Sequence, residues 1–249
     1  MQKIKQLYRT DYNGETIVKD LIYSGQGWSK NVEHVPNNVI NDQISNKAVI
    51  LGNGPSRLEL NSGLFTYLDN HKGGLLAAGR LQTYGCNALI RDYTPDFLIA
   101  NGTDIIKEMS DNNYATRTIT YADSDAVLDY PGKFYLIPQN PSWDAGAIAA
   151  YLACFDGHKT VYLLGFDTHS GEADHNYNVY AGTNGYATRN SPNQESFFSQ
   201  TLLEVMTTYS DVDFVRVMPT ETYYMPESWK YQLNLRQIDF RAFTLEVDL

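Results

Sequence analysis

The chain has 249 residues, and its 19 Lys and Arg against 29 Asp and Glu give a formal net charge of -10. Such an acidic chain repels the phosphates of nucleic acids and of anionic membranes, so we expect neither as a partner. A hydrophobic fraction of 43% is enough for a substantial core. The length favours one large α/β domain with at most a small appendage.

Two cysteines, Cys86 and Cys154, are too few for a disulfide scaffold and too far apart for a zinc or redox motif. Residues 1–15 lack the apolar segment of a secretory signal, and the longest apolar stretch, 145–155, has 11 residues. A membrane-spanning helix needs about 20. We therefore expect a cytoplasmic protein without a membrane span.

Residues 1–46 differ from the rest of the chain in their pattern of β-prone and polar residues. Asn13-Gly14 stands between two β-prone runs, 6–12 and 16–23, and Asn-Gly is the strongest short signal for a β-hairpin. A polar, Asn-rich segment follows. We predict a small N-terminal β-hairpin appendage and an irregular linker, before a main domain that covers residues 47–249.

From Lys47 on, short apolar runs alternate with helical patterns, which is typical of a mostly parallel sheet with helices on both faces. The pattern predicts a Rossmann-like α/β domain. The predicted strands are 48–51, 75–78, 96–100, 116–121, 134–137, 160–164 and 212–217, and the predicted helices are 57–69, 87–92, 103–110, 142–155 and 194–209. We expect Ser142 to cap its helix and Gly157 to follow its end.

The first candidate site is the turn Gly52-Asn53-Gly54-Pro55-Ser56, which follows an apolar strand and starts a helix. Glycines allow the backbone to approach a ligand, and free N–H groups at a helix start favour an anion. The turn matches neither the dinucleotide fingerprint nor the phosphate-binding P-loop. A tight turn capped by Asn53 or Ser56 is an equally good interpretation.

Asn87, after the second predicted strand, is a second candidate, because ligands of open α/β sheets bind at strand carboxyl ends. A helix cap is at least as good an interpretation of Asn87 taken by itself. A third group follows the strand 160–164 and contains Asp167, His169, Asp174 and His175. These side chains suit acid-base chemistry or, less well, a metal site, and a solvated polar loop is the alternative.

The chain resembles the bacterial sialyltransferases of glycosyltransferase family 42 in four motifs that occur in the same order. These are the GNGPS turn, Cys86-Asn87, the small-residue helix start 144–147 and Gly165-Phe166-Asp167. They also resemble the wider group with a GNGPS turn, which includes flagellin glycosylation factors and pterin pyrophosphokinase-like domains. The resemblance covers about residues 47–180. It implies a Rossmann-like domain that binds a nucleotide sugar, possibly CMP-linked, without a metal or other cofactor.

The resemblance also implies residue roles. Asn53 and Asn87, with the adjoining Gly52, Gly54 and Ser56, would hold the nucleotide. The family has a Ser where this chain has Ala145, so only the backbone of Ala145 and Gly146 would remain for that contact. Two family tyrosines, six residues apart, contact the phosphate. Here His169 and His175 have that spacing, and an imidazole also donates to phosphate.

The family's catalytic base is a histidine in a lid segment, and the corresponding stretch 183–200 contains none. His175 or Asp174 would have to replace it, or the transferred sugar is not sialic acid. A lid at about 170–192 is expected, because the stretch with Tyr177 and Tyr180 is long, glycine-punctuated and rich in tyrosine.

The leading hypothesis is therefore a metal-independent glycosyltransferase that moves a sugar to the hydroxyl of a glycan acceptor, with Asp167 orienting the site loop. The alternatives are a Mg²⁺-dependent diphosphate transferase, with metal ligands Asp167, Glu172 and Asp174, and a non-catalytic nucleotide-binding module. The sequence leaves open a homo-oligomer and the packing of the C-terminal segment with Trp229, Tyr231 and Phe240.

Overall fold

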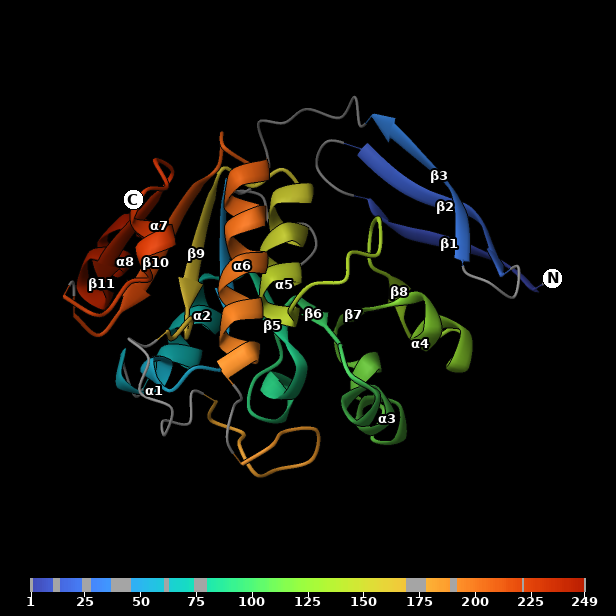
Figure 1. The fold of residues 1–249 in the computed structure, drawn as a ribbon, viewed down its shortest axis with the longest axis horizontal. Coiled ribbons are helices and arrows are strands. Elements are labelled where there is room, and N and C mark those ends of the chain that lie inside the picture. The colour runs from blue at the N-terminus through green and yellow to red at the C-terminus, as the bar shows by residue number, and fades with distance from the viewer. Residues whose placement is uncertain are drawn as a thin grey trace.

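The computed structural model describes residues 2–10, 14–23, 28–36, 46–60, 63–73, 80–168, 178–188, 192–220 and 222–248. Among these residues, the main domain contains an eight-stranded, all-parallel sheet in the order β11-β10-β9-β4-β5-β6-β7-β8 (Figure 1). The strands are β4 (Lys47–Leu51), β5 (Gln82–Cys86), β6 (Phe97–Ile99), β7 (Ile119–Ala122), β8 (Tyr135–Leu136), β9 (Thr160–Leu164), β10 (Asp213–Met218) and β11 (Leu235–Asp239). The predicted Rossmann-like class is confirmed.

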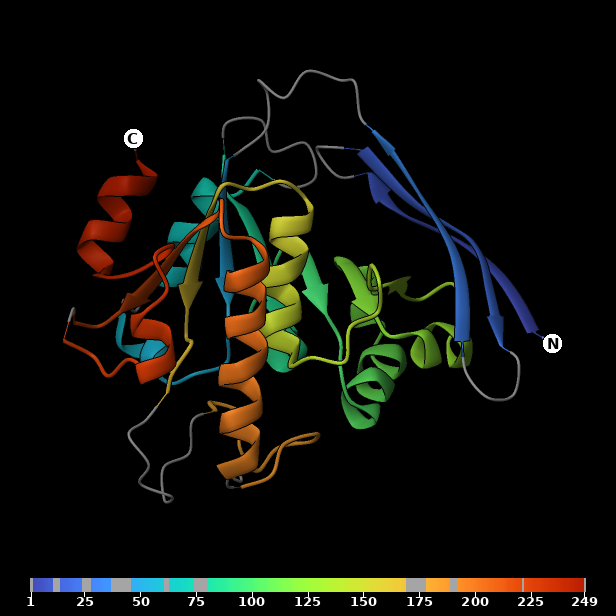
Figure 2. The same ribbon diagram turned by 45° about the horizontal axis from the view of Figure 1, so that its top comes forward.

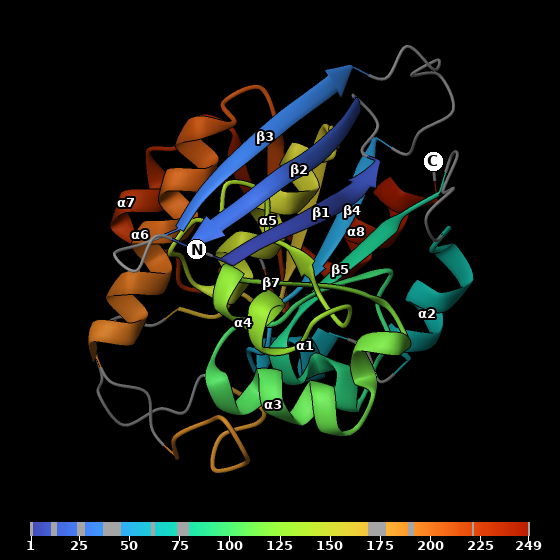
Figure 3. The ribbon, with the colours of Figure 1, turned by 90° about the vertical axis from the view of Figure 1, so that its right-hand side faces the viewer.

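Helices cover both faces of the sheet. In β4, Ala48 and Ile50 pack with helices α5 (Ala145–Phe155) and α6 (Pro192–Thr208). The alternate residues Val49 and Leu51 pack with α2 (Leu64–His71) and α8 (Phe240–Val247). Figure 3 shows these two helix layers on opposite sides of β4. Successive side chains of a strand point to opposite faces of the sheet. Because helices cover both faces of β4, every residue faces a core, and the strand is apolar throughout.

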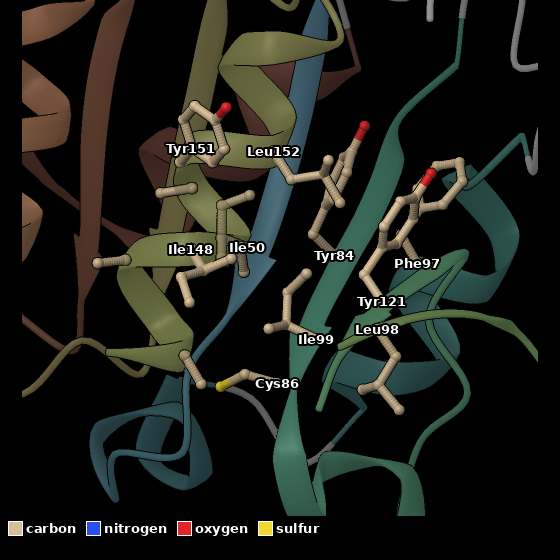
Figure 4. Packing of buried hydrophobic residues seen from close by; sticks show 14 of the residues in the cluster. Ile50, Tyr84, Cys86, Phe97, Leu98, Ile99, Tyr121, Ile148, Tyr151 and Leu152 are labelled. Carbon is tan, nitrogen blue, oxygen red and sulfur yellow. The ribbon is translucent and has the colours of Figure 1, made fainter. Parts of the chain in front are cut away.

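Helix α5 lies between the sheet and α6. Figure 4 shows Ile148 and Leu152 of this helix directed toward Ile50 and Tyr84 on the strands. Ten of its residues, Ala145 to Cys154, are buried, since α6 covers its outer side. A helix enclosed in this way can be apolar on every face.

The path of the chain creates a switch point. From β4 the chain adds β5, β6, β7 and β8 in one direction, and α5 then returns it to β9 on the other side of β4. The following strands β10 and β11 extend the sheet away from β4. Ligands of open α/β sheets bind outside the carboxyl ends of the strands at such a reversal.

Several element predictions require correction. No strand was predicted at residues 82–86, but they form β5, in which even Gln82 and Thr83 are buried. The predicted strand 75–78 lies outside the described residues. The predicted strand 116–121 is a 3-10 turn, Tyr114–Thr116, followed by β7. Strand β11 was not predicted, because its residues are only partly buried at the sheet edge and show no clear alternation.

The helices also differ in detail from the prediction. Residues 57–69 form two helices, α1 (Ser56–Leu60) and α2, and residues 87–91 form a 3-10 helix, η3 (Asn87–Arg91). Helix α3 (Thr103–Asp111) agrees closely with the prediction. The sequence analysis missed the two short helices α4 (Ser124–Asp129) and α7 (Glu227–Lys230) and the C-terminal helix α8.

The N-terminal region has a third strand in addition to the predicted hairpin. Strands β1 (Gln2–Thr10), β2 (Gly14–Tyr23) and β3 (Trp28–Pro36) form an antiparallel sheet, which Figure 2 shows beside the main domain. Part of the predicted linker is therefore a strand. Within the residues that the structure describes, no helix has the length and apolar character that crossing a membrane requires.

The C-terminal segment packs on the main domain. Trp229 is buried, and its Nε1 donates to the backbone oxygen of Ser199 at 3.0 Å. Phe240 packs on the face of the sheet that α2 and α8 cover, whereas Tyr231 is exposed. This segment therefore completes the sheet and its helix layer.

Candidate functional site

A cleft of about 360 Å³ lies at the carboxyl ends of the central strands. It is lined by the segments that follow β4, β5, β6 and β9, by the start of α5, by the loop 178–188 and by α6. Figures 1 and 2 show these strand ends converging on the side of the fold where the loop lies. The predicted residues that line this cleft are Gly52, Asn53, Gly54, Asn87, Ala145, Gly146 and Asp167.

The turn after β4 is tied to the turn after β9. Gly52 N donates to Leu164 O at 2.8 Å, and Gly54 N donates to Gly165 O at 2.9 Å. A Cβ on Gly52 would lie 2.5 Å from Gly165 O. The glycines of the turn are therefore required by the contact between two backbone segments, which brings both turns to the cleft.

Asp167 joins the same two turns through its side chain. Its Oδ2 accepts from Ser56 Oγ at 2.7 Å, and its two oxygens accept from Ser56 N at 3.2 and 3.3 Å. Burial raises the pKa of Asp167, while the bonds from Ser56 oppose this rise. Asp167 thus orients the GNGPS turn, and Ser56 contributes to the site through this bond without lining the cleft.

The side chain of Asn53 forms hydrogen bonds with three other groups of the protein. Its Nδ2 donates to Cys86 O at 3.3 Å and to the Tyr186 hydroxyl at 3.1 Å. Its Oδ1 accepts from the guanidinium of Arg57 at 3.3 Å. An amide has two donor hydrogens and two acceptor lone pairs, so one lone pair is left for a ligand.

Arg57, which was not predicted as a site residue, lies outside the cleft lining and is hydrogen-bonded to the turn after β4. It is buried, and its Nη1 donates to Gly52 O at 2.9 Å. Its Nη2 donates to the hydroxyl of Tyr180 at 2.8 Å. The first charged residue after the glycine turn is therefore a structural part of the site.

Asn87 has a left-handed backbone with φ of 50°, a conformation that Asn tolerates better than most residues. Its Oδ1 accepts from Asn101 N at 2.8 Å. Asn101 also lines the cleft, and its Nδ2 donates to Trp143 O at 3.2 Å. Asn101 was not predicted as a site residue, although it directly follows a predicted strand, as Asn87 follows β5.

Asp144, not the predicted Ser142, is the N-cap of α5. Its Oδ1 accepts from Gly146 N at 2.8 Å, so this backbone N–H serves the cap. Gly157 follows the helix end with φ of 94°, as predicted. Asp144 lines the cleft, and burial raises its pKa above the ordinary value of 3.8.

The shift in the pKa of Asp144 predicts a pH-dependent difference in stability. Because its folded-state pKa is raised, ionisation of Asp144 opposes folding, and stability present at lower pH is lost as the pH rises through this pKa. Asp144→Asn keeps a good N-cap but cannot ionise. Urea unfolding of both proteins between pH 3.5 and 7 should show the variant gaining stability relative to wild type as the pH rises. A difference that is constant across this range would contradict the prediction.

The described part of the predicted lid, residues 178–188, covers the carboxyl edge of the sheet. Val179 N donates to Asn53 O at 2.8 Å. Tyr180 is buried outside the cleft lining, where its hydroxyl donates to Asp92 Oδ2 at 2.6 Å and accepts from Arg57. Tyr186, which the prediction did not select, faces the cleft instead.

An ion pair fastens the far side of this loop. Arg91 binds both carboxylate oxygens of Glu108 at 2.7 and 2.6 Å. Arg91 also donates to Thr183 Oγ1 at 2.7 Å and to Asn184 O at 2.9 Å. Gly185 fits closely against α3, since a Cβ there would lie 2.7 Å from the side chain of Ile105. The loop is thus attached near its start, at Val179, and at its middle, residues 183–185.

Aromatic residues also line the cleft. Trp143, Phe166, Phe197 and Phe198 line the cleft, and 46% of the Phe197 surface is exposed. Aromatic faces of this kind suit a planar base or the apolar face of a sugar ring. Cys86 also lines the cleft, but burial raises the pKa of its thiol to about 12, so a nucleophilic thiolate is disfavoured.

Other predicted residues lie outside the described part of the chain. They are His169, Glu172, Asp174, His175 and Tyr177. The predicted phosphate contacts and the predicted base therefore stay predictions. Among the described residues, no group of three or more His, Cys, Asp or Glu side chains is arranged to hold a metal ion.

The fold and the cleft define this chain as a Rossmann-like α/β protein with a polar and aromatic cleft at its switch point. Comparison with protein family models, with curated proteins and with solved structures finds no significant match.

Proposed function

We propose that the chain is a glycosyltransferase that binds a nucleotide-activated sugar in this cleft. The observation that carries the proposal is the convergence of Asn53, Asn87 and Asn101, from the ends of three neighbouring strands, in a cleft that aromatic residues also line. Amides provide both donors and acceptors for a base or a ribose, and aromatic rings accept a flat face. The position at the switch point agrees with a nucleotide.

In the proposed reaction, an acceptor hydroxyl oxygen forms a bond to the anomeric carbon of the sugar. The bond from this carbon to the phosphate oxygen breaks, and the nucleotide leaves with the electron pair. A general base takes the acceptor proton, and His175 and Asp174 stay the candidates for this role. The buried guanidinium of Arg57 holds the turn after β4 from outside the cleft lining, and the carboxylates of Asp144 and Asp167 line the cleft itself.

A thermal-shift series with CMP, CDP, UDP and GDP, each with and without Mg²⁺, tests the ligand class. At a ligand concentration of 100 Kd, binding stabilises the folded state by about 2.7 kcal/mol. At roughly 2–4 °C per kcal/mol for a domain of this size, we expect one nucleotide to raise the melting temperature by about 5–10 °C without Mg²⁺. No shift with any nucleotide would overturn the proposal.

The same series separates the other interpretations. A shift that requires Mg²⁺ would favour diphosphate transfer, in which Asp167 would have to exchange its bonds from Ser56 for a metal. A shift without turnover of any nucleotide sugar would indicate a binding module.

Asn87→Gly tests the role of the amide itself. Glycine tolerates the left-handed backbone, so the substitution removes the side chain without the strain that alanine would add. We expect the affinity for the stabilising nucleotide to fall about tenfold, as for one lost hydrogen bond of roughly 1.4 kcal/mol. Calorimetric titration measures this change.

The matched control is Asn113→Gly. Asn113 has the same left-handed conformation, with φ of 53°, at a 3-10 turn outside the cleft lining. We expect this variant to bind as wild type does. Equal affinities for the two variants would remove Asn87 from the site.

A further inference from the structure

The hydroxyl of Tyr186 lies where the donors of the cleft converge. It accepts from Asn53 Nδ2 at 3.1 Å and from the backbone N of Ala88 at 3.4 Å. The amide of Asn53 and the backbone N–H of Ala88, the second residue of η3, therefore point to one phenolic oxygen.

This arrangement leaves Asn53 without a donor for a ligand. One hydrogen of its Nδ2 is directed to Cys86 O, within the rigid strand end, and the other to Tyr186. The bond to Cys86 joins two adjacent strands of the sheet, whereas the bond to Tyr186 joins the sheet to the loop 178–188. The loop bond is therefore the one that can be exchanged without deforming the sheet.

The Tyr186 oxygen has the properties of a competing acceptor. The ring lines the cleft, next to the aromatic ring of Tyr180 at a centroid distance of 6.0 Å. Its neutral phenolic oxygen accepts hydrogen bonds, as a ribose hydroxyl or a base carbonyl does, and burial raises the pKa of Tyr186 further.

We propose that Tyr186 determines ligand specificity as an internal competitor, whose hydroxyl occupies the place of a nucleoside oxygen on Asn53 and Ala88. The inference rests on the proposed nucleotide site. A nucleoside enters by replacing the phenolic oxygen, and the loop 178–188 releases Tyr186 while its other attachments, at Asn53 O, Arg57 and Arg91, hold it in place. Ligands without a correctly placed oxygen acceptor leave the contact intact and are rejected.

Tyr186→Phe tests the competition, because it removes one oxygen and keeps the ring. With CMP as the probe, calorimetric titration should show binding about fivefold tighter than wild type, as for one net hydrogen bond. Binding by the variant where wild type shows none would support the inference even more strongly. Unchanged or weaker binding of CMP by the variant overturns it.

Tyr151→Phe is the matched control. It also removes one buried hydroxyl, which donates to Pro138 O at 3.3 Å in the core and lies outside the cleft lining. Its affinity for CMP should match that of wild type. If the affinity for CMP rose fivefold in both variants, the cause would be a general loss of rigidity in the protein, and the competition by Tyr186 would be overturned.

Amide hydrogen exchange of the wild-type protein provides a measurement that does not depend on the variant. Saturation with CMP should speed exchange in peptides that cover residues 178–188, since the loop loses one attachment. Slower exchange there overturns the inference. If CMP, CDP, UDP and GDP bind neither wild type nor Tyr186→Phe, the proposed function fails. If wild type binds a nucleotide and Tyr186→Phe does not bind it more tightly, only the competition is refuted.

Discussion

Gly54→Ala is expected to abolish nucleotide binding and to lower the free energy of unfolding by about 3 kcal/mol, the upper range for an overpacked site. A Cβ on Gly54 would lie 1.7 Å from Asp167 Oδ2 and 2.6 Å from Gly165 O. The carboxylate would have to move, and it would then lose its bonds to Ser56. Chemical denaturation and nucleotide titration measure the two effects.

Gly132→Ala is the control for this variant. Gly132 has φ of 79° and no atom within 4 Å of a Cβ, so alanine there meets backbone strain but no neighbour. We expect a loss of about 1 kcal/mol and normal nucleotide binding. If Gly54→Ala costs no more than Gly132→Ala, the two turns are not packed as closely as the structure shows.

Arg216→Met is expected to lower the free energy of unfolding by about 3–5 kcal/mol, as for the loss of one member of a buried polar network. Arg216 is fully buried, and it donates to Phe166 O at 3.0 and 2.8 Å and to Thr168 Oγ1 at 3.1 Å. Burial lowers the pKa of the guanidinium to about 10, so it stays charged at neutral pH. Methionine fills much of the volume but leaves these acceptors without a donor.

Arg236→Met is the matched control in the neighbouring strand. Arg236 pairs with Glu246 at 2.6 Å, but 47% of its side chain is exposed. Surface pairs contribute about 0–1 kcal/mol, so a small loss is expected. Equal urea midpoints for the two variants would contradict the structural role of Arg216.

The parts of the fold that were predicted correctly have local causes. The strand β4 and the turn 52–56 are recognisable because an apolar run ends at glycines, and α5 because its small apolar residues are followed by Gly157. Strand β5 was missed because its residues are polar in sequence. They are buried only since neighbouring strands and α5 enclose them.

The candidate site was partly predictable for the same reason. Asn53, Asn87 and Asp167 follow strands directly, and parallel strands bring their carboxyl ends together. Phe197 reaches the cleft from α6, which is distant in sequence from the turns, so no local pattern marks it. In the loop 178–188, composition indicates a tyrosine-rich cover but cannot distinguish Tyr186, in the cleft, from Tyr180, which is packed behind it.

The reciprocal contact between the turns after β4 and β9 determines which part of the cleft can move. A Cβ on Gly52 would meet Gly165 O, and one on Gly165 would meet Gly52 O at 2.8 Å. Neither turn can shift without the other, so the two strand ends behave as one preformed floor. The conformational entropy lost on ligand binding is then confined to the loop 178–188. Single substitutions in this loop can therefore change ligand affinity while the turns after β4 and β9 stay unchanged.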